Sequence, residues 1–105
     1  MARILDVLAE RLLIFDGATG TYLQGEDLCL DDFQGLEGCN EILSISRPDV
    51  VRGMHAAYLE AGADVIETNT FGGTRLTLNE FGIGERAFEI NAAAARRFAA
   101  PPFAG

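Results

Sequence analysis

The sequence AGADVIET occupies residues 61–68 of this 105-residue chain. Its glycine, Gly62, directly precedes a short run that contains valine, isoleucine and threonine. Glycine commonly follows the last turn of a helix, and β-branched residues are enriched in strands. The stretch therefore predicts a helix that ends near Gly62 and a strand over Ala63–Thr68.

The residues before this stretch have the features of a helix. Ser46 can cap the first amides, Pro48 fits the first turn, and Asp49 is placed as the acid of a capping box. Apolar residues then recur at helical spacing and form one face, which consists of Val50, Val51, Met54, Tyr58 and Ala61. The pattern predicts a helix that begins near Pro48.

An earlier apolar run, Leu12–Phe15, ends at the turn pair Asp16-Gly17 and predicts a buried strand. Helical spacing before it predicts a lead-in helix over residues 1–11. Residues 17–44 are interpreted as a long loop with a helical turn near Thr19–Gln24, and loops of this length usually serve a function. Strand, crossover helix and strand form a βαβ unit, in which the two strands are parallel.

The C-terminal part predicts two more helices. Thr74 can cap a short helix that runs through Phe81, and a longer helix spans about Glu85–Ala100. The apolar face of the longer helix is expected to consist of Phe88, Ala92, Ala95 and Phe98 or Ala99. Pro101-Pro102 ends it, and Phe103–Gly105 is interpreted as the start of a third strand.

Together these elements predict an α/β fold. Parallel strands need both faces covered, and a complete barrel uses roughly 30 residues for each strand–helix unit. The chain is therefore interpreted as one partial domain over residues 1–105. It corresponds to the N-terminal portion of a (βα)8 TIM barrel, with a lead-in helix, two βα units and the start of a third strand.

Composition excludes several classes of partner. The net charge of −8 disfavours binding to nucleic acid and to anionic membrane surfaces. No apolar run is long enough to span a bilayer, and the first residues lack the pattern of a secretory signal. These features predict a cytoplasmic protein.

The sequence predicts no local metal site and no catalytic constellation. Cys29 and Cys39 are ten residues apart and match no structural zinc spacing, so they are interpreted as free thiols. The single histidine, His55, is expected on the polar, solvated side of its helix. No Ser/His/Asp or Cys/His arrangement is visible.

Polar residues follow the first predicted strand. In a parallel barrel, the carboxyl ends of the strands carry the active site. There the Asp16 carboxylate could bind an ammonium group, and Gly17 and Gly20 would let a ligand approach the backbone of residues 16–21. The alternative is a plain turn, since Asp-Gly is a common turn pair.

A second polar group, Glu67–Phe71, follows the second predicted strand and offers a dense set of hydrogen-bond donors and acceptors. The alternative is that Thr68 and Thr70 are simply good strand formers and that Glu67 pairs with an arginine. The candidate substrate-binding residues are Asp16, Gly17, Ala18, Glu67, Asn69 and Thr70.

Three stretches, in this order, resemble the homocysteine S-methyltransferase family. They are IFDGATGT at 14–21, CNEILS at 39–44 leading to RPDVV at 47–51, and YLEAGADVIETNTF at 58–71. The resemblance continues through NEFG at 79–82 and EINAAA at 89–94. It is strongest to the N-terminal, homocysteine-binding module of the cobalamin-dependent members, the methionine synthases.

The resemblance implies a (βα)8 barrel that binds zinc through three cysteines. In the family, the zinc holds homocysteine as a thiolate, which accepts a methyl group and becomes methionine. Methylcobalamin carries the methyl group in the methionine synthases, and betaine or S-methylmethionine supplies it in relatives. By this resemblance, Asp16 and Gly17 would contact the amino-acid end of homocysteine, and Asn69 and Thr70 would line the same mouth.

Neither Cys29 nor Cys39 falls in the zinc motifs of that family. The chain is therefore expected to be a truncated product or one segment of a split protein, which transfers no methyl group when isolated. The alternative is a non-catalytic remnant that acts only by associating with a partner that completes the barrel. Expected partners are homocysteine, the rest of the barrel and further modules of a methionine synthase.

Overall fold

The computed structural model describes the backbone of residues 4–99 and the side chains of residues 4–97. The predicted third strand at Phe103–Gly105 lies outside these residues. The described elements are, in order, α1 (Ile4–Leu8), α2 (Thr19–Gln24), η1 (Leu30–Phe33), η2 (Asn40–Ile42), α3 (Leu43–Ser46), α4 (Pro48–Glu60), α5 (Arg75–Leu78), η3 (Asn79–Phe81), η4 (Gly84–Arg86) and α6 (Ala87–Ala99), where η marks a 3₁₀ helix. None of the described helices is long and apolar enough to cross a membrane.

The two predicted strands are reduced to one parallel bridge, between Phe15 and Val65. Its hydrogen bonds run from the Val65 amide to the Ile14 carbonyl at 3.1 Å and from the Asp16 amide to the Val65 carbonyl at 2.9 Å. The prediction of parallel pairing is confirmed. The prediction of two full strands is wrong for the described chain, because a two-stranded pairing on its own is only marginally stable.

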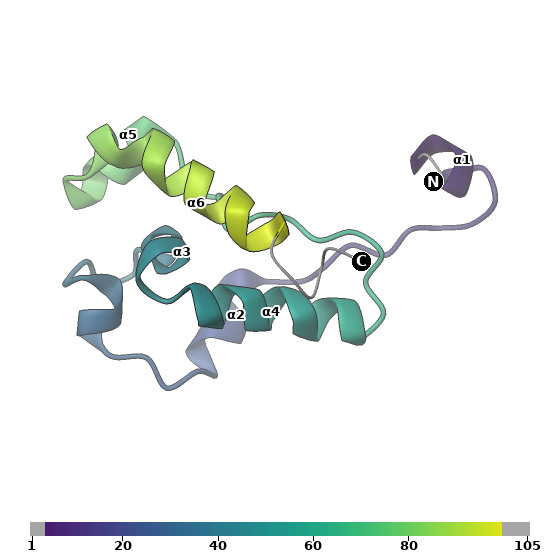
Figure 1. Cartoon of the computed structure of the whole chain (residues 1–105), viewed down its shortest axis with the longest axis horizontal. Coiled ribbons are helices and arrows are strands. Elements are labelled where there is room, and N and C mark those ends of the chain that lie inside the picture. The colour runs from purple at the N-terminus through teal and green to yellow at the C-terminus, as the bar shows by residue number, and fades with distance from the viewer. Residues whose placement is uncertain (1–3, 100–105) are drawn as a thin grey trace.

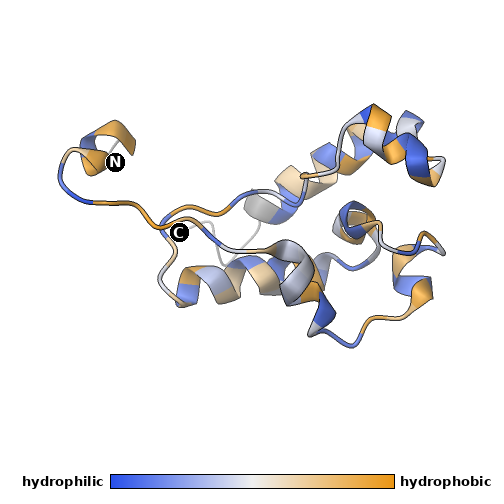
Figure 2. Cartoon of the chain, turned by 180° about the vertical axis from the view of Figure 1, so that it is seen from behind, coloured by the Kyte–Doolittle hydropathy of each residue, from blue (hydrophilic) through white to orange (hydrophobic). Residues whose placement is uncertain are grey.

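The first of these segments is also more exposed than predicted. Leu12, Ile14 and Phe15 have exposed fractions of 88%, 60% and 55%. Figure 2 shows hydrophobic colouring along the extended segment that follows α1. Figure 1 shows α1 itself set apart from the other helices, and it contributes no buried residue. The barrel arrangement remains a prediction.

Helix α4 begins at Pro48, as predicted, but its N-terminus differs in detail. The N-cap residue is Arg47 and has no side-chain cap hydrogen bond, so the predicted Ser46 cap is wrong. Ser46 instead ends α3, and its hydroxyl donates to the carbonyls of Asp32 and Ile42. Arg47 forms an ion pair with Asp49 at 2.9 Å. At the other end, Gly62 has a φ of +113°, a conformation that favours glycine.

His55 lies on the buried side of α4, and the prediction of a solvated histidine is wrong. Its exposed fraction is 0%, and Val50, Val51 and Met54 of the same helix are also buried. The predicted polar side of α4 is covered because this helix contacts α2 as well as α3 and α6.

The core consists of two clusters that meet at Phe33. The first contains Leu23, Leu43, Val50 and Val51, and the second contains Cys39, Ile42, Leu78 and Ile90. Helix α3 contacts both α4 and α6, and Figure 1 shows it between the first turns of these two longer helices. Cys39, Ile42 and Leu43, at the end of the predicted loop, therefore supply part of the core.

The C-terminal helices follow the prediction in position. Thr74 caps α5, since its hydroxyl oxygen accepts the Thr77 amide at 3.2 Å. The predicted apolar face of α6 is wrong, because Phe88 is 88% exposed whereas Ile90, Ala93 and Ala94 are buried. Part of that predicted face, Phe98 or Ala99, lies outside the described side chains.

Candidate functional site

A cavity of about 270 Å³ lies where the two polar groups predicted from the sequence come together. It is lined by Asp16, Gly17, Ala18, Thr19, Gly20, Asn40, Glu41, Glu67, Thr68, Asn69 and Phe71. Three of these residues are acidic, and none is basic. The cavity therefore favours a ligand with a positively charged group.

Asp16 joins the two sides of this cavity. Its carboxylate oxygen Oδ2 accepts the Glu67 amide at 3.0 Å, while its own amide donates to the Val65 carbonyl at 2.9 Å. The bridge between Phe15 and Val65 thus fixes the Asp16 carboxylate next to the start of the second polar group. The predicted proximity of these two segments is confirmed.

Gly17 allows helix α4 to approach the cavity closely. A Cβ atom at this position would lie 3.0 Å from the Tyr58 hydroxyl and 3.1 Å from a ring carbon of Tyr58. The Tyr58 hydroxyl donates to the Ala18 carbonyl at 2.9 Å. Tyr58 therefore packs against the backbone of Gly17 and holds that of Ala18 by a hydrogen bond. A larger residue at Gly17 would displace the Tyr58 side chain.

Asn69 lines the cavity but also has a structural role. It is 3% exposed, and its Nδ2 donates to the Asn40 carbonyl at 2.9 Å and to the Ser44 hydroxyl at 3.2 Å. Thr70, by contrast, is not among the lining residues. Its hydroxyl shares a 2.8 Å hydrogen bond with that of Thr68. The other predicted residues, Asp16, Gly17, Ala18 and Glu67, all line the cavity.

Sequence reasoning missed Asn40 and Glu41 as site residues. Both belong to η2, in the segment interpreted as a long loop. Glu41 contacts the residue that follows the second polar group, since its Oε2 accepts the Gly72 amide at 2.9 Å. The available signal was the stretch CNEILS at 39–44, which carried part of the family resemblance.

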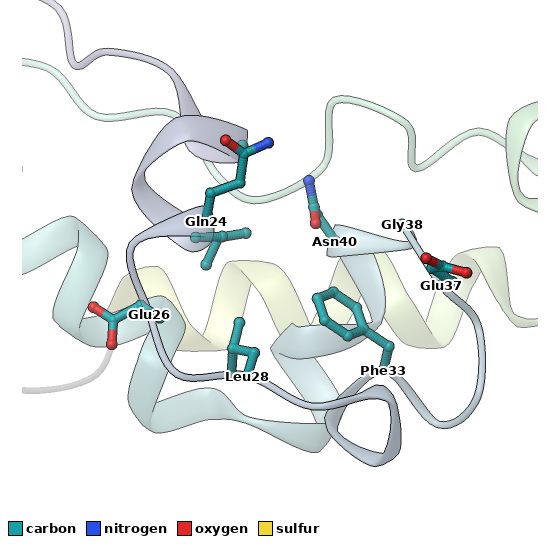
Figure 3. A pocket seen from close by; sticks show the side chains of 9 residues that line it. Gln24, Glu26, Leu28, Phe33, Glu37, Gly38 and Asn40 are labelled. Carbon is teal, nitrogen blue, oxygen red and sulfur yellow. The ribbon is translucent and has the colours of Figure 1, made fainter.

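A second cavity adjoins the first and shares Gly20 and Asn40 with it. Its volume is about 370 Å³, and its lining combines apolar Leu23, Leu28 and Phe33 with acidic Glu26 and Glu37. Figure 3 shows Leu28 and Phe33 on the opposite side from Gln24 and Asn40. The linings of the two adjoining cavities contain acidic residues and no basic residue, so both cavities are acidic.

His55 lies close enough to Asp16 for their charges to interact. Burial lowers the pKa of His55, and the Asp16 carboxylate opposes this effect by favouring the imidazolium. Because burial is the larger influence, the folded chain holds His55 in its neutral form more strongly than the unfolded chain does.

Acidification from about pH 7 to about pH 5 is expected to destabilise the chain through His55. The pKa of histidine in the unfolded chain is near 6.5, and the pKa of His55 in the folded chain is lower. As the pH falls, the unfolded state therefore takes up the proton first, and the free energy of unfolding decreases. Asp32, Asp49 and Asp64 have lowered pKa values and act in a more acidic range. Urea unfolding at both pH values measures the effect, and His55→Gln should flatten it. An unchanged pH dependence in His55→Gln would contradict this assignment.

The described residues do not fit a metal centre. Within residues 4–99, no group of three or more histidine, cysteine or acidic side chains could hold a metal ion. Cys29 is an exposed free thiol, and Cys39 is a buried one. Burial raises the pKa of Cys39, which keeps its thiol protonated.

Comparison with known proteins shows the family of the chain. The family model described as homocysteine S-methyltransferase matches residues 13–100, which is most of the chain. The chain belongs to the homocysteine S-methyltransferase family. This family match includes both polar groups and the η2 turn that carries Glu41.

Two similar homocysteine S-methyltransferase relatives are methionine synthases from mycobacteria. The protein from Mycobacterium tuberculosis is 52% identical over 99 residues, and these cover 91% of this chain and 8% of the relative. The protein from Mycobacterium leprae is 50% identical over 88 residues, which cover 84% of this chain and 7% of the relative. The chain thus spans less than a tenth of the length of these relatives.

Proposed function

We propose that this chain is the homocysteine-binding part of a homocysteine S-methyltransferase domain of the methionine synthase type. Such a domain transfers a methyl group to the homocysteine thiolate and forms methionine. The observation that carries the proposal is the Asp16 carboxylate, held at the cavity wall by the Glu67 amide at 3.0 Å. The identity to the two methionine synthases supports the same substrate class.

The chemistry of the cavity suits the amino-acid end of homocysteine. An α-ammonium group forms strong, charge-assisted hydrogen bonds with a carboxylate, and the lining provides Asp16 and Glu67. The cavity volume of about 270 Å³ suits a small amino acid. The proposed substrate-binding residues are Asp16, Gly17, Ala18, Glu67 and Asn69. Thr70, which is outside the lining, would act through Thr68.

The family resemblance also implies zinc and, in the methionine synthase type, methylcobalamin. Zinc would hold the substrate sulfur as a thiolate, and methylcobalamin would carry the methyl group. Because the described residues offer no zinc ligand set, this segment is proposed to bind and orient homocysteine without activating its thiol. Thiolate activation is assigned to residues other than those described.

We also propose that the segment contributes the first two βα units of a (βα)8 barrel. The parallel bridge between Phe15 and Val65 supports this arrangement. The exposed side chains of Leu12, Ile14 and Phe15 would pack against the rest of the barrel. The same exposure favours the alternative that the chain acts by associating with a completing partner. Association would appear as a concentration-dependent mass in size-exclusion chromatography.

Calorimetric titration tests the substrate assignment. L-Homocysteine should bind the chain at least about ten-fold more tightly than 4-mercaptobutanoate, which is the same thiol acid without the amino group. The reason is that only the amino acid presents an ammonium group to the acidic lining. Equal affinity for the two ligands, or no binding of homocysteine, would contradict the proposal.

A further inference from the structure

The loop Thr70–Gly73 presents a fully exposed aromatic ring at the first cavity. Phe71 lines the cavity and is 100% exposed, whereas the next two residues, Gly72 and Gly73, are buried. Buried backbone amides and carbonyls need hydrogen-bond partners. The conformation of this loop therefore depends on the groups that satisfy Gly72 and Gly73.

Glu41 satisfies the Gly72 amide from one side. Its Oε2 accepts this amide at 2.9 Å, across a sequence separation of 31 residues. A Cβ atom at Gly72 would lie 3.1 Å from the same oxygen and 3.3 Å from Thr77 Cγ2. An alanine side chain at Gly72 would therefore crowd the Glu41 carboxylate and push it away from the Gly72 amide.

Asn91 of α6 holds the loop from a second direction. Its Nδ2 donates to the Gly73 carbonyl at 2.8 Å and to the Ala87 carbonyl at 2.7 Å. A Cβ atom at Gly73 would lie only 2.7 Å from Asn91 Oδ1. The loop is thus anchored to η2 through Glu41 and to α6 through Asn91.

The η2 turn holds the chain on both sides of Phe71. The Asn40 carbonyl accepts from Asn69 at 2.9 Å, and Glu41 accepts from Gly72 at 2.9 Å. These bonds anchor Asn69 and Gly72, which lie before and after Phe71 in the sequence. The hydrogen bond that Glu41 accepts is therefore one of the contacts that hold the backbone next to Phe71.

We propose that Glu41 is a positioning residue of the homocysteine site, which acts by accepting the Gly72 amide and so fixing Phe71 at the mouth. This role rests on the function proposed above. Glu41 also lines the cavity, so the competing possibility is a direct charge interaction with the substrate ammonium group. The two roles differ in what they require, because positioning needs an acceptor oxygen whereas direct recognition needs a negative charge.

Four variants separate these roles. Glu41→Ala removes the acceptor, and Glu41→Gln keeps an acceptor oxygen but removes the charge. Gly72→Ala adds a methyl group against the Glu41 carboxylate without changing the charge. Glu80→Ala is the matched control, since Glu80 is an exposed acidic residue outside both cavities.

The measurements are calorimetric titration with L-homocysteine and NMR amide exchange at Gly72, with circular dichroism to confirm folding. Positioning predicts that Glu41→Ala and Gly72→Ala weaken binding about 3- to 10-fold, while Glu41→Gln and Glu80→Ala stay within about two-fold of the original chain. Exchange at Gly72 should accelerate at least about ten-fold in Glu41→Ala and stay slow in Glu41→Gln.

Equal losses of affinity in Glu41→Gln and Glu41→Ala would overturn the proposal in favour of direct recognition. Unchanged Gly72 exchange in Glu41→Ala would overturn it as well. If Glu41→Ala does not fold, Gly72→Ala and Glu41→Gln still give opposite predictions. If the original chain does not bind homocysteine, the proposed function fails, whereas exchange at Gly72 still tests whether Glu41 fixes the loop.

Discussion

Replacing Ile90 with alanine should lower the free energy of unfolding by about 2–5 kcal/mol. Ile90 has an exposed fraction of 0% and packs in the cluster that contains Cys39, Ile42 and Leu78. The substitution removes three carbons from this cluster and leaves a cavity between α6, η2 and α5. Urea unfolding followed by circular dichroism measures the change through the transition midpoint.

Phe88→Ala is the matched control for this prediction. Phe88 lies on the same helix but is 88% exposed, so its removal should change stability by no more than about 0.5 kcal/mol. If the two substitutions had equal effects, the face of α6 that packs on the core would be wrongly assigned. A larger effect for Phe88 would favour the face expected from sequence alone.

This contrast shows what sequence periodicity could not determine for α6. The position and length of the helix follow from Gly82, which precedes it, from the alanine run and from Pro101-Pro102 in the sequence after it. Its buried face does not, because alanines fit either side and both faces carry one large apolar residue. The choice between Phe88 and Ile90 depends on η2 and α5, which pack against the helix from elsewhere in the chain.

A similar limit applies to His55. Helical spacing placed it away from Val51, Met54 and Tyr58, but α4 contacts several neighbours and buries more than one side. Ile14 and Phe15 differ from the prediction in the other direction, since they are exposed where burial was expected. Their apolar character predicted burial, yet the described chain pairs their segment only with the one around Val65.

The candidate site was predictable where it depends on the ends of the two paired segments. The tips of the two strands, at Asp16 and at Thr68–Thr70, were expected to lie side by side because parallel strands end at the same edge. The hydrogen bond between the Glu67 amide and the Asp16 carboxylate brings these segments together. Glu41 was not predictable in this way, since its bond to Gly72 links an irregular turn to a loop. No periodicity connects such segments, although the family resemblance included the turn that carries Glu41 and the chain up to Phe71.

Replacing Asp16 with asparagine should weaken the binding of L-homocysteine about 10- to 100-fold. Asparagine keeps an oxygen that can accept the Glu67 amide, so the local structure should persist. What it loses is the negative charge that would pair with the substrate ammonium group. Calorimetric titration measures the affinity, and exposed Asp27→Asn, outside both cavities, serves as the control.

The same substitution gives an independent signal at His55. Because the Asp16 carboxylate raises the pKa of His55 against the effect of burial, removing its charge should lower that pKa further. NMR titration of the imidazole measures this shift without any ligand. A lower His55 pKa with unchanged homocysteine affinity would show that the charge was removed and that substrate recognition does not depend on it. That result would exclude Asp16 as the ammonium-binding residue.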